Sequence, residues 1–181
     1  MNKTDLKLYA ITDRQWLHGA RLSEHVKLAI EGGATMIQIR DKDILSTDSD
    51  AGLKDEYSEA LEIKRICHEH KVPLIINDNV QFAIDIDADG VHLGQDDMNP
   101  AEARKLLGTD KIIGVTAKTV EQAKRAEADG ADYLGSGAVF GSTTKLNAKP
   151  MTKELLSEIT AAVDIPVSYT HLRAHETVLD L

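Results

Sequence analysis

The chain has 181 residues, 42% of them hydrophobic, which is enough for one domain with a packed core. Its formal charge of −9 at pH 7 argues against a nucleic-acid surface, which usually has a basic patch. No stretch approaches the roughly 20 apolar residues that span a bilayer, and the N-terminus lacks the apolar segment of a signal peptide. We therefore expect a cytoplasmic protein that binds neither nucleic acid nor membrane.

Short apolar runs alternate with helical segments along the chain. Six runs have the length and apolar content of buried parallel strands, namely residues 8–12, 35–40, 73–77, 90–94, 111–116 and 132–137. A seventh strand begins within residues 164–167. Between the strands, Asn99, Thr119 and Thr152 are predicted helix N-caps. Successive βα units predict a parallel sheet, either doubly wound or closed into a (β/α)8 barrel.

A weak internal repeat accompanies these units. The segments "GGATMIQI", "ADGVHLG" and "ADGADYLG" each run from a helix stop, through a small residue, into a strand. Because their spacing is irregular, they indicate a repeated βα unit and not a solenoid of fixed period.

The cysteine and the histidines are interpreted as structural residues. Cys67 is the only cysteine, so no internal disulfide is possible, and a buried helix position explains it better than a nucleophilic role. His92 lies within a predicted strand and is interpreted as a core histidine. His171 and His175 have the spacing of zinc ligands but lack the glutamate of an H-E-x-x-H pattern, so no zinc site is predicted there.

Basic residues follow the second predicted strand. In either architecture, functional residues lie at the carboxyl ends of strands. Gln38, Arg40 and Lys42 occupy alternate positions, so their side chains should point the same way. An arginine and a lysine at one strand end suit a diphosphate or a carboxylate, although the charges could equally mark the start of a loop.

Oxygen ligands follow the next two strands. Asn77 and Asp78 come after the third strand, and Gln95, Asp96 and Asp97 come after the fourth. Asn and Asp also favour turns, which is the structural alternative. Mg²⁺ takes oxygen ligands, usually one or two carboxylates together with phosphate oxygens. Acidic residues beside a basic clamp therefore predict a metal ion and an anionic leaving group at the same edge.

Hydroxyl groups follow the fifth and sixth strands. Thr116 ends the fifth, and the loop "GAVFGSTTKLNAK" after the sixth contains Ser142, Thr143, Thr144 and Lys145. Hydroxyl, backbone N–H and ammonium groups suit anion capture, although such runs are also common in plain loops. The sequence has no dinucleotide-binding glycine pattern and no recognisable nucleophile–base pair.

Taken in order, "QIRDK", "IND", "GVHLGQDDM", "GVTAKT" and "VFGSTTK" resemble the thiamine phosphate synthase family over residues 8–167. The resemblance implies a (β/α)8 TIM barrel and a Mg²⁺-dependent transferase of thiamine biosynthesis acting on small phosphorylated substrates. That family joins a hydroxymethylpyrimidine diphosphate to a thiazole phosphate by a dissociative substitution that releases pyrophosphate. Alternatives are a thiazole tautomerase, which shares the fold but lacks the full pyrimidine clamp, and a non-catalytic paralogue that binds thiazole phosphate.

The resemblance also implies a role for each site residue. The pyrimidine diphosphate would be bound by Gln38, Arg40, Lys42, Asn77, Thr116 and Lys145. The thiazole phosphate would be bound by Ser142, Thr143 and Thr144, and Mg²⁺ by Asp78 and Asp97.

Three positions depart from the family pattern. Thr116 stands where the family usually has Ser, which keeps the hydroxyl, and Gly141 and Ser142 replace the Pro and Thr of F-P-T-x-T-K. No side-chain nucleophile is expected, because the reaction needs positioning and stabilisation of the departing charge.

The resemblance stops near residue 167. The family implies a glycine-rich turn, another helix and an eighth strand, whereas the sequence continues "SYTHLRAHETVLDL". We predict a barrel of residues 1–167, incomplete at its last strands, and an atypical tail of residues 168–181 that is foreign sequence; a native replacement helix is the alternative. Because TIM barrels commonly bind phosphate after strands seven and eight, we hypothesise that this chain folds poorly or is inactive.

Overall fold

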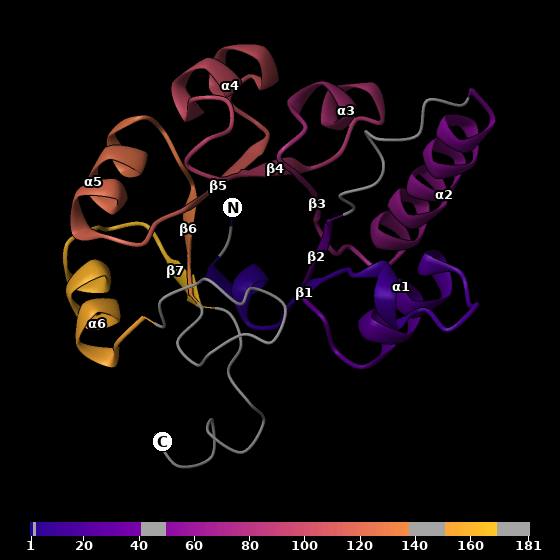
Figure 1. Cartoon of the computed structure of the whole chain (residues 1–181), viewed down its shortest axis with the longest axis horizontal. Helices are drawn as coiled ribbons and strands as arrows, with labels where there is room; N and C mark the ends of the chain where they lie inside the picture. Colours follow the sequence, from indigo (N-terminus) through magenta and orange to yellow (C-terminus); the bar gives the residue numbers. More distant parts are fainter. Residues whose placement is uncertain (2, 41–49, 138–150, 170–181) are drawn as a thin grey trace. The chain divides into compact units, whose positions relative to one another are not determined.

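The computed structural model describes residues 1, 3–40, 50–137 and 151–169. Strands and helices alternate along this part of the chain (Figure 1). The chain divides into two compact units. The first unit is Met1–His92 with Lys105–Ile112, and the second unit is Leu93–Arg104 with Ile113–Leu181. Each unit is described by itself.

The strands are parallel and follow one another in chain order. They are β1 (Tyr9–Ile11), β2 (Met36–Ile39), β3 (Leu74–Asn77), β4 (Gly90–Leu93), β5 (Ile112–Thr116), β6 (Tyr133–Ser136) and β7 (Val167–Tyr169). A doubly wound sheet reverses its strand order at a switch point, and this sheet does not. The fold class is therefore the predicted (β/α)8 barrel, incomplete within the described residues.

A helix follows each of the first six strands. The α-helices are α1 (Leu22–Glu31), α2 (Asp50–Glu69), α3 (Val80–Asp85), α4 (Pro100–Leu107), α5 (Val120–Ala128) and α6 (Lys153–Ala161). Two short 3-10 helices, η1 (Lys3–Leu6) and η2 (Arg14–Trp16), flank β1.

The predicted helix caps are confirmed. Thr119 Oγ1 accepts from the Gln122 backbone N–H at 3.2 Å, and Thr152 Oγ1 accepts from Leu155 at 3.1 Å. Asn99 Oδ1 accepts from the backbone N–H of Ala101 at 2.9 Å. These side chains satisfy N–H groups that the first helical turn leaves without an intrahelical partner.

Helix α3 was not predicted from the sequence. It is only six residues long, which is too short to show a helical period in its apolar residues. The signal that could have found it is Asn79, whose side chain accepts from the Phe82 backbone N–H at 2.9 Å and caps the helix.

Cys67 is buried on α2, as predicted, with 0% exposure. Burial, and to a smaller extent the charge of Asp89, raises the pKa of its thiol to about 12. The thiol is therefore protonated at neutral pH and unsuited to nucleophilic chemistry.

The amino ends of three strands are held by a repeated side-chain contact. Thr35, Asp89 and Asp132 each immediately precede an even-numbered strand, and we call them the strand-start acceptors. Their side-chain oxygens accept from the backbone N–H groups of Leu8, Leu74 and Ile113, each at 2.8 Å. Each acceptor thus ties its own strand to the start of the strand before it, and a backbone donor that the ladder would leave unpaired is satisfied.

Proline precedes two of the odd-numbered strands. Pro73 lies before β3 and Pro166 before β7, and their carbonyls accept from Ile37 at 3.0 Å and Leu134 at 2.9 Å. Because proline has no N–H, these two positions need no acceptor of their own. The three segments of the weak sequence repeat therefore coincide with the three strand-start acceptors at the sheet's amino edge.

Strand β7 ends two residues later than the sequence suggests. The sequence places Ser168 and Tyr169 in the tail, but they pair with Gly135 and Ser136 of β6. The alternation of apolar residues gave no signal for them, because a serine and an exposed tyrosine do not form a buried run. Residues 170–181 lie outside the described residues, and the foreign origin of the tail stays a prediction.

Across the described ranges, no helix combines the length and the apolar character required to cross a membrane.

We predict that Asp132→Ala lowers the free energy of unfolding by about 1–3 kcal/mol. The substitution leaves the N–H of fully buried Ile113 without its acceptor and removes the 2.7 Å ion pair with Arg104. Urea denaturation measures the effect. Asp132→Asn keeps an acceptor oxygen and should lose less. Asp110→Ala, at an exposed carboxylate, should stay within about 0.5 kcal/mol of the parent chain. Equal losses for Asp132→Ala and Asp110→Ala would contradict the role of the acceptor.

We also predict a pH-dependent contribution from Asp87. Hydrogen bonds from Lys111 first and Lys64 second lower the pKa of its carboxyl from 3.8 to about 2. Because the folded pKa is below the unfolded one, the carboxylate stabilises the fold above about pH 4, and this is lost as the pH falls towards 2. Asp87→Asn should therefore be less stable than the parent chain at pH 7 and equally stable near pH 2.

The expected difference for Asp87→Asn is small, below about 1 kcal/mol, because the side chain is 73% exposed and salt screens such pairs. Asparagine also tolerates the left-handed backbone at this position, where φ is 52°, so the substitution isolates the charge. Urea titrations at pH 7 and pH 2, with and without added salt, measure it. A difference that is the same at both pH values would refute the assignment.

Candidate active site

Strand register brings three of the predicted site residues of the first unit to one face of the sheet. Ile39 pairs with Ile76, so the next residues, Arg40 and Asn77, are side by side at the carboxyl ends of β2 and β3. Side chains alternate along a strand, which places Gln38 on the same face as Arg40. The predicted common orientation of Gln38 and Arg40 is consistent with this register. Lys42 lies outside the described residues.

Gln38 is held from within the sheet. It is 2% exposed, and its side-chain amide donates to the hydroxyl of Tyr9 on β1. Tyr9 pairs with Met36, two residues before Gln38, so its ring leaves the same face. The amide orientation is therefore fixed before any ligand is present.

The backbone of Arg40, just after β2, is bonded to the side chain of Thr12, just after β1. The Arg40 backbone N–H donates to Thr12 Oγ1 at 3.0 Å, and the Thr12 N–H donates to the carbonyl of Gln38 at 2.9 Å. Arg40 is half-buried, as is Thr12. The main chain that presents the guanidinium is thus anchored to the end of β1.

Asp78 directly follows β3 in a left-handed backbone conformation with φ of 62°. Its backbone N–H donates to the carbonyl of His92 at 2.8 Å, and its Oδ2 accepts from the side-chain amide of Asn77 at 2.6 Å. A non-glycine residue in this region costs about 1 kcal/mol or more and is concentrated at functional sites. The strain turns the chain sharply and keeps the carboxylate beside Asn77.

In the second unit, Asp97 and Thr116 are each tied to the loop after β4. Asp97 Oδ2 accepts from the Gly94 backbone N–H at 2.6 Å. Gln95, from the same loop, donates its side-chain amide to the carbonyl of Thr116 at the end of β5. Ser142, Thr143, Thr144 and Lys145 lie outside the described residues.

His92 is a core histidine, as predicted, and it also shares a sheet face with predicted site residues. It is buried, with 9% exposure, which fits a core histidine. However, it pairs with Asn77 in the register of β3 and β4, so it shares the face that bears Asn77 and Arg40. Strand alternation could have placed it on one face of β4, but only the register shows that this face is the one with the other polar residues.

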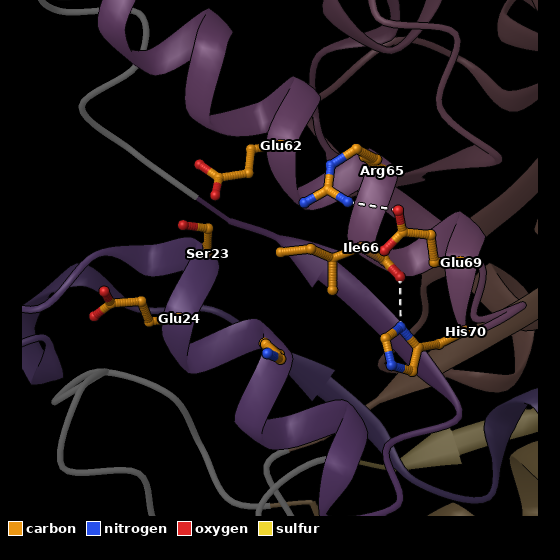
Figure 2. Close-up of a pocket in the computed structure, with 8 residues that line it drawn as sticks. Ser23, Glu24, Glu62, Arg65, Ile66, Glu69 and His70 are labelled. Carbon is orange, nitrogen blue, oxygen red and sulfur yellow. Dashed lines mark hydrogen bonds and ion pairs between the residues drawn. The ribbon is translucent and has the colours of Figure 1, made fainter.

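A hollow lies elsewhere in the first unit, between α1 and α2 (Figure 2), and its volume is about 340 Å³. Its walls are formed by Ser23, Glu24, Lys27, Glu62, Arg65, Ile66, Glu69 and His70. Several of its charged groups are already paired: Arg65 with Glu69, Lys27 with Glu31 at 3.9 Å, and Glu62 with Arg21 at 2.7 Å. None of the predicted site residues that the structure describes lines this hollow, so it is not the candidate active site.

The predicted magnesium ligands supply the right atoms. Asp78 in the first unit and Asp97 in the second are carboxylates, and both are oriented by a hydrogen bond to one oxygen. Hard oxygen ligands of this kind suit Mg²⁺. Among the described residues no group of three or more His, Cys, Asp or Glu side chains could hold a metal ion. A site with two carboxylates, completed by phosphate oxygens, does not require such a group.

Comparison with known proteins decides the family. A family model described as thiamine monophosphate synthase matches residues 8–169. The chain belongs to the thiamine monophosphate synthase family. It is 45% identical over 167 residues to the thiamine-phosphate synthase of Clostridium acetobutylicum, covering 92% of this chain and 76% of that protein. The thiamine-phosphate synthase of Caldanaerobacter subterraneus is 44% identical over 167 residues, covering 92% and 75%.

Solved structures agree with this family assignment. The thiamine phosphate pyrophosphorylase of Pyrococcus furiosus superposes with a TM-score of 0.78 at 35% identity, over 92% of this chain and 75% of that one. FabK from Thermotoga maritima superposes with a TM-score of 0.61 at 17% identity, which shows a shared fold alone. The predicted resemblance is thus confirmed. The tautomerase and non-catalytic alternatives are not favoured, because the curated relatives of this synthase family are named as synthases.

We predict that Asp78→Gly is more stable than Asp78→Ala by about 1 kcal/mol. Both substitutions remove the carboxylate and its bond from Asn77, so they differ only in their tolerance of a φ of 62°. Glycine adopts this conformation freely, whereas the Cβ of alanine is strained. Thermal and urea denaturation of the two purified variants measure the difference. If the alanine variant were the more stable one, the backbone at Asp78 would not be strained.

Proposed function

We propose that the chain catalyses the transfer that joins 4-amino-2-methyl-5-hydroxymethylpyrimidine diphosphate to 4-methyl-5-(2-phosphoethyl)thiazole. The opposing hypothesis, that the atypical tail leaves this chain inactive, stays a prediction that the same assay decides. The bond between the methylene carbon and the diphosphate oxygen breaks, and its electron pair leaves with pyrophosphate. The lone pair of the thiazole nitrogen forms the new bond to the methylene carbon, which gives thiamine phosphate. Atoms and charge balance without a side-chain nucleophile, as in a dissociative substitution.

The observation that carries the proposal is that the family assignment and the positions of the site residues in the sheet agree. The chain is 45% identical to a curated thiamine-phosphate synthase over 92% of its length. Within the first unit, the same residues that the family motif assigns to the pyrimidine diphosphate, Gln38, Arg40 and Asn77, share one face and one edge of the sheet. Parallel barrels place their chemistry at this carboxyl edge.

Arg40 is the described residue proposed to bind the diphosphate. A guanidinium can form two parallel hydrogen bonds to phosphate oxygens and stays charged at any physiological pH. Gln38 and Asn77 are proposed to hold the polar edge of the pyrimidine substrate with their amides, and Thr116 to contribute its hydroxyl. Lys42 and Lys145 are proposed to add positive charge on the same substrate, and Ser142, Thr143 and Thr144 to bind the thiazole phosphate.

Asp78 and Asp97 are proposed to hold Mg²⁺. A bound Mg²⁺ neutralises part of the diphosphate charge and so makes pyrophosphate a better leaving group. The protein's own contribution is to keep both carboxylates oriented: Asn77 donates to Asp78, and the Gly94 N–H donates to Asp97. Groups that orient metal ligands commonly change metal affinity by about 10- to 100-fold when they are altered.

The remaining expectations follow the same proposal. Both substrates are small phosphorylated molecules, and the positive charge for binding them is local in a chain whose formal charge is −9. A cytoplasmic location fits a biosynthetic enzyme of this kind and stays a prediction, as does the absence of nucleic-acid partners.

The test is the release of pyrophosphate from the pyrimidine diphosphate, followed with and without the thiazole phosphate and with and without Mg²⁺. The expected result is release that requires all three components and yields thiamine phosphate. We further predict that Gly94→Ala raises the half-saturating Mg²⁺ concentration about tenfold, because a Cβ there would lie 2.7 Å from Asp97 Oδ2 and displace the carboxylate.

Gly32→Ala is the matched control for Gly94→Ala. Gly32 ends α1, its φ is −75°, and it is not among the proposed ligand-binding residues, so the Mg²⁺ requirement should be unchanged. Both variants should unfold within about 1 kcal/mol of the parent chain, since the Asp97 side chain can rotate away. A chain that binds neither substrate would refute the proposed function. An unchanged Mg²⁺ requirement in Gly94→Ala would refute the role of Asp97 alone.

A further inference from the structure

Two threonine hydroxyls fasten β1 to β2, one at each end of the strand pair. At the amino end, Thr35 Oγ1 accepts from the Leu8 N–H at 2.8 Å and donates to the carbonyl of Asp5 at 2.8 Å. At the carboxyl end, Thr12 Oγ1 accepts from the Arg40 N–H at 3.0 Å. The two contacts have the same chemistry, but only the second lies beside a residue proposed to bind substrate.

The side chain of Thr12 replaces one backbone hydrogen bond of the parallel ladder between β1 and β2. The Thr12 N–H donates to the carbonyl of Gln38 at 2.9 Å, as in a continuing ladder. In that pattern the Arg40 N–H would next donate to the backbone carbonyl of Thr12. Instead it donates to the Thr12 side chain. The hydroxyl therefore lets the main chain of β1 turn away after Ile11 while the backbone of Arg40 remains held against β1.

The segment that follows Thr12 is itself fixed to α2. Arg14, two residues further on, forms an ion pair with Glu59 at 3.2 Å. The other carboxylate oxygen of Glu59 accepts from the backbone N–H of Leu22, the first residue of α1, at 2.9 Å. Glu59 is 12% exposed, so solvent screens these contacts only in part. Thr12 therefore lies between the end of β1 and a loop that the ion pair of Arg14 with Glu59 holds against α2.

We propose that Thr12 is a positioning residue for the pyrimidine diphosphate, acting through Arg40. The proposal rests on the proposed function, in which Arg40 binds the diphosphate. Thr12 does not touch the substrate. Its hydroxyl fixes the backbone from which the guanidinium extends, so that a two-pronged contact with phosphate oxygens forms without reordering the chain. Binding energy that would otherwise be used to order this segment is then available to hold the substrate.

The test is the dissociation constant of the pyrimidine diphosphate, measured by calorimetry with Mg²⁺ and without the thiazole phosphate. Thr12→Val has nearly the same shape but no hydroxyl, and we expect it to weaken binding by about three- to tenfold. Thr12→Ser keeps the hydroxyl and should bind within about twofold of the parent chain. Thr12→Ala also lacks the hydroxyl and should weaken binding in the same way. It provides the measurement if Thr12→Val does not fold.

Thr35→Val is the matched control. It removes a hydroxyl that joins the same two strands at the opposite end, so it should lower the melting temperature and leave the dissociation constant unchanged. If Thr12→Val and Thr35→Val had the same affinity, Thr12 would be purely structural and the inference would fall, whereas the proposed function would stand. If the parent chain did not bind the pyrimidine diphosphate, the proposed function would fail first and the inference with it.

A double substitution shows whether Thr12 acts through Arg40. Arg40→Ala should weaken binding by itself, and adding Thr12→Val to it should change the affinity by less than about twofold, because the group that Thr12 positions is already gone. If the two effects on the dissociation constant multiplied as independent changes do, Thr12 would act by another route, and the proposal would be wrong.

Discussion

The strand arrangement of this molecule depends on how the backbone is satisfied at the amino edge of the sheet. A parallel strand begins with an N–H that its neighbour's ladder does not reach, and an unpaired buried donor costs about 1–3 kcal/mol. The missing acceptor is supplied by the side chains of Thr35, Asp89 and Asp132, each at 2.8 Å from the N–H group. A hydroxyl and two carboxylates thus make the same contact. The position therefore requires an oxygen of the right reach and not a particular residue. These contacts agree with the strand register from which the site residues are counted.

At the carboxyl edge, a hydrogen bond from a backbone N–H to a side-chain oxygen has a different role. There Thr12 lets β1 part from β2 while the backbone of Arg40 is still held against β1. Asp78 is turned by a strained φ of 62°, and the Gly94 N–H orients Asp97. The two edges have different roles: at the amino edge side-chain acceptors satisfy the main chain, and the carboxyl edge presents charged groups. This division is the general arrangement of parallel barrels.

The elements could be predicted from the sequence because buried parallel strands are apolar runs and the helix caps have distinct side chains. The first six strands lie inside their predicted ranges, and Asn99, Thr119 and Thr152 cap helices. Helix α3 is too short for its apolar periodicity to be detected. Strand β7 includes a serine and a tyrosine, which do not form the apolar run that predicts a buried strand. Of the site, strand ends indicated Arg40 and Asn77. The contribution of Thr12 and the face of His92 depend on pairing between strands, which one sequence does not contain.

The strand-start acceptors also bear on how the chain is made. Their hydrogen bonds join residues 27, 15 and 19 positions apart, so each closes a short loop around two adjacent strands. Closing a loop costs entropy that grows with its length, by about 0.6 kcal/mol for each doubling. Each pair of strands can therefore be joined soon after its second strand leaves the ribosome, without waiting for distant parts of the chain. The acceptors thus make the fold a series of local steps, suited to assembly from the N-terminus during synthesis.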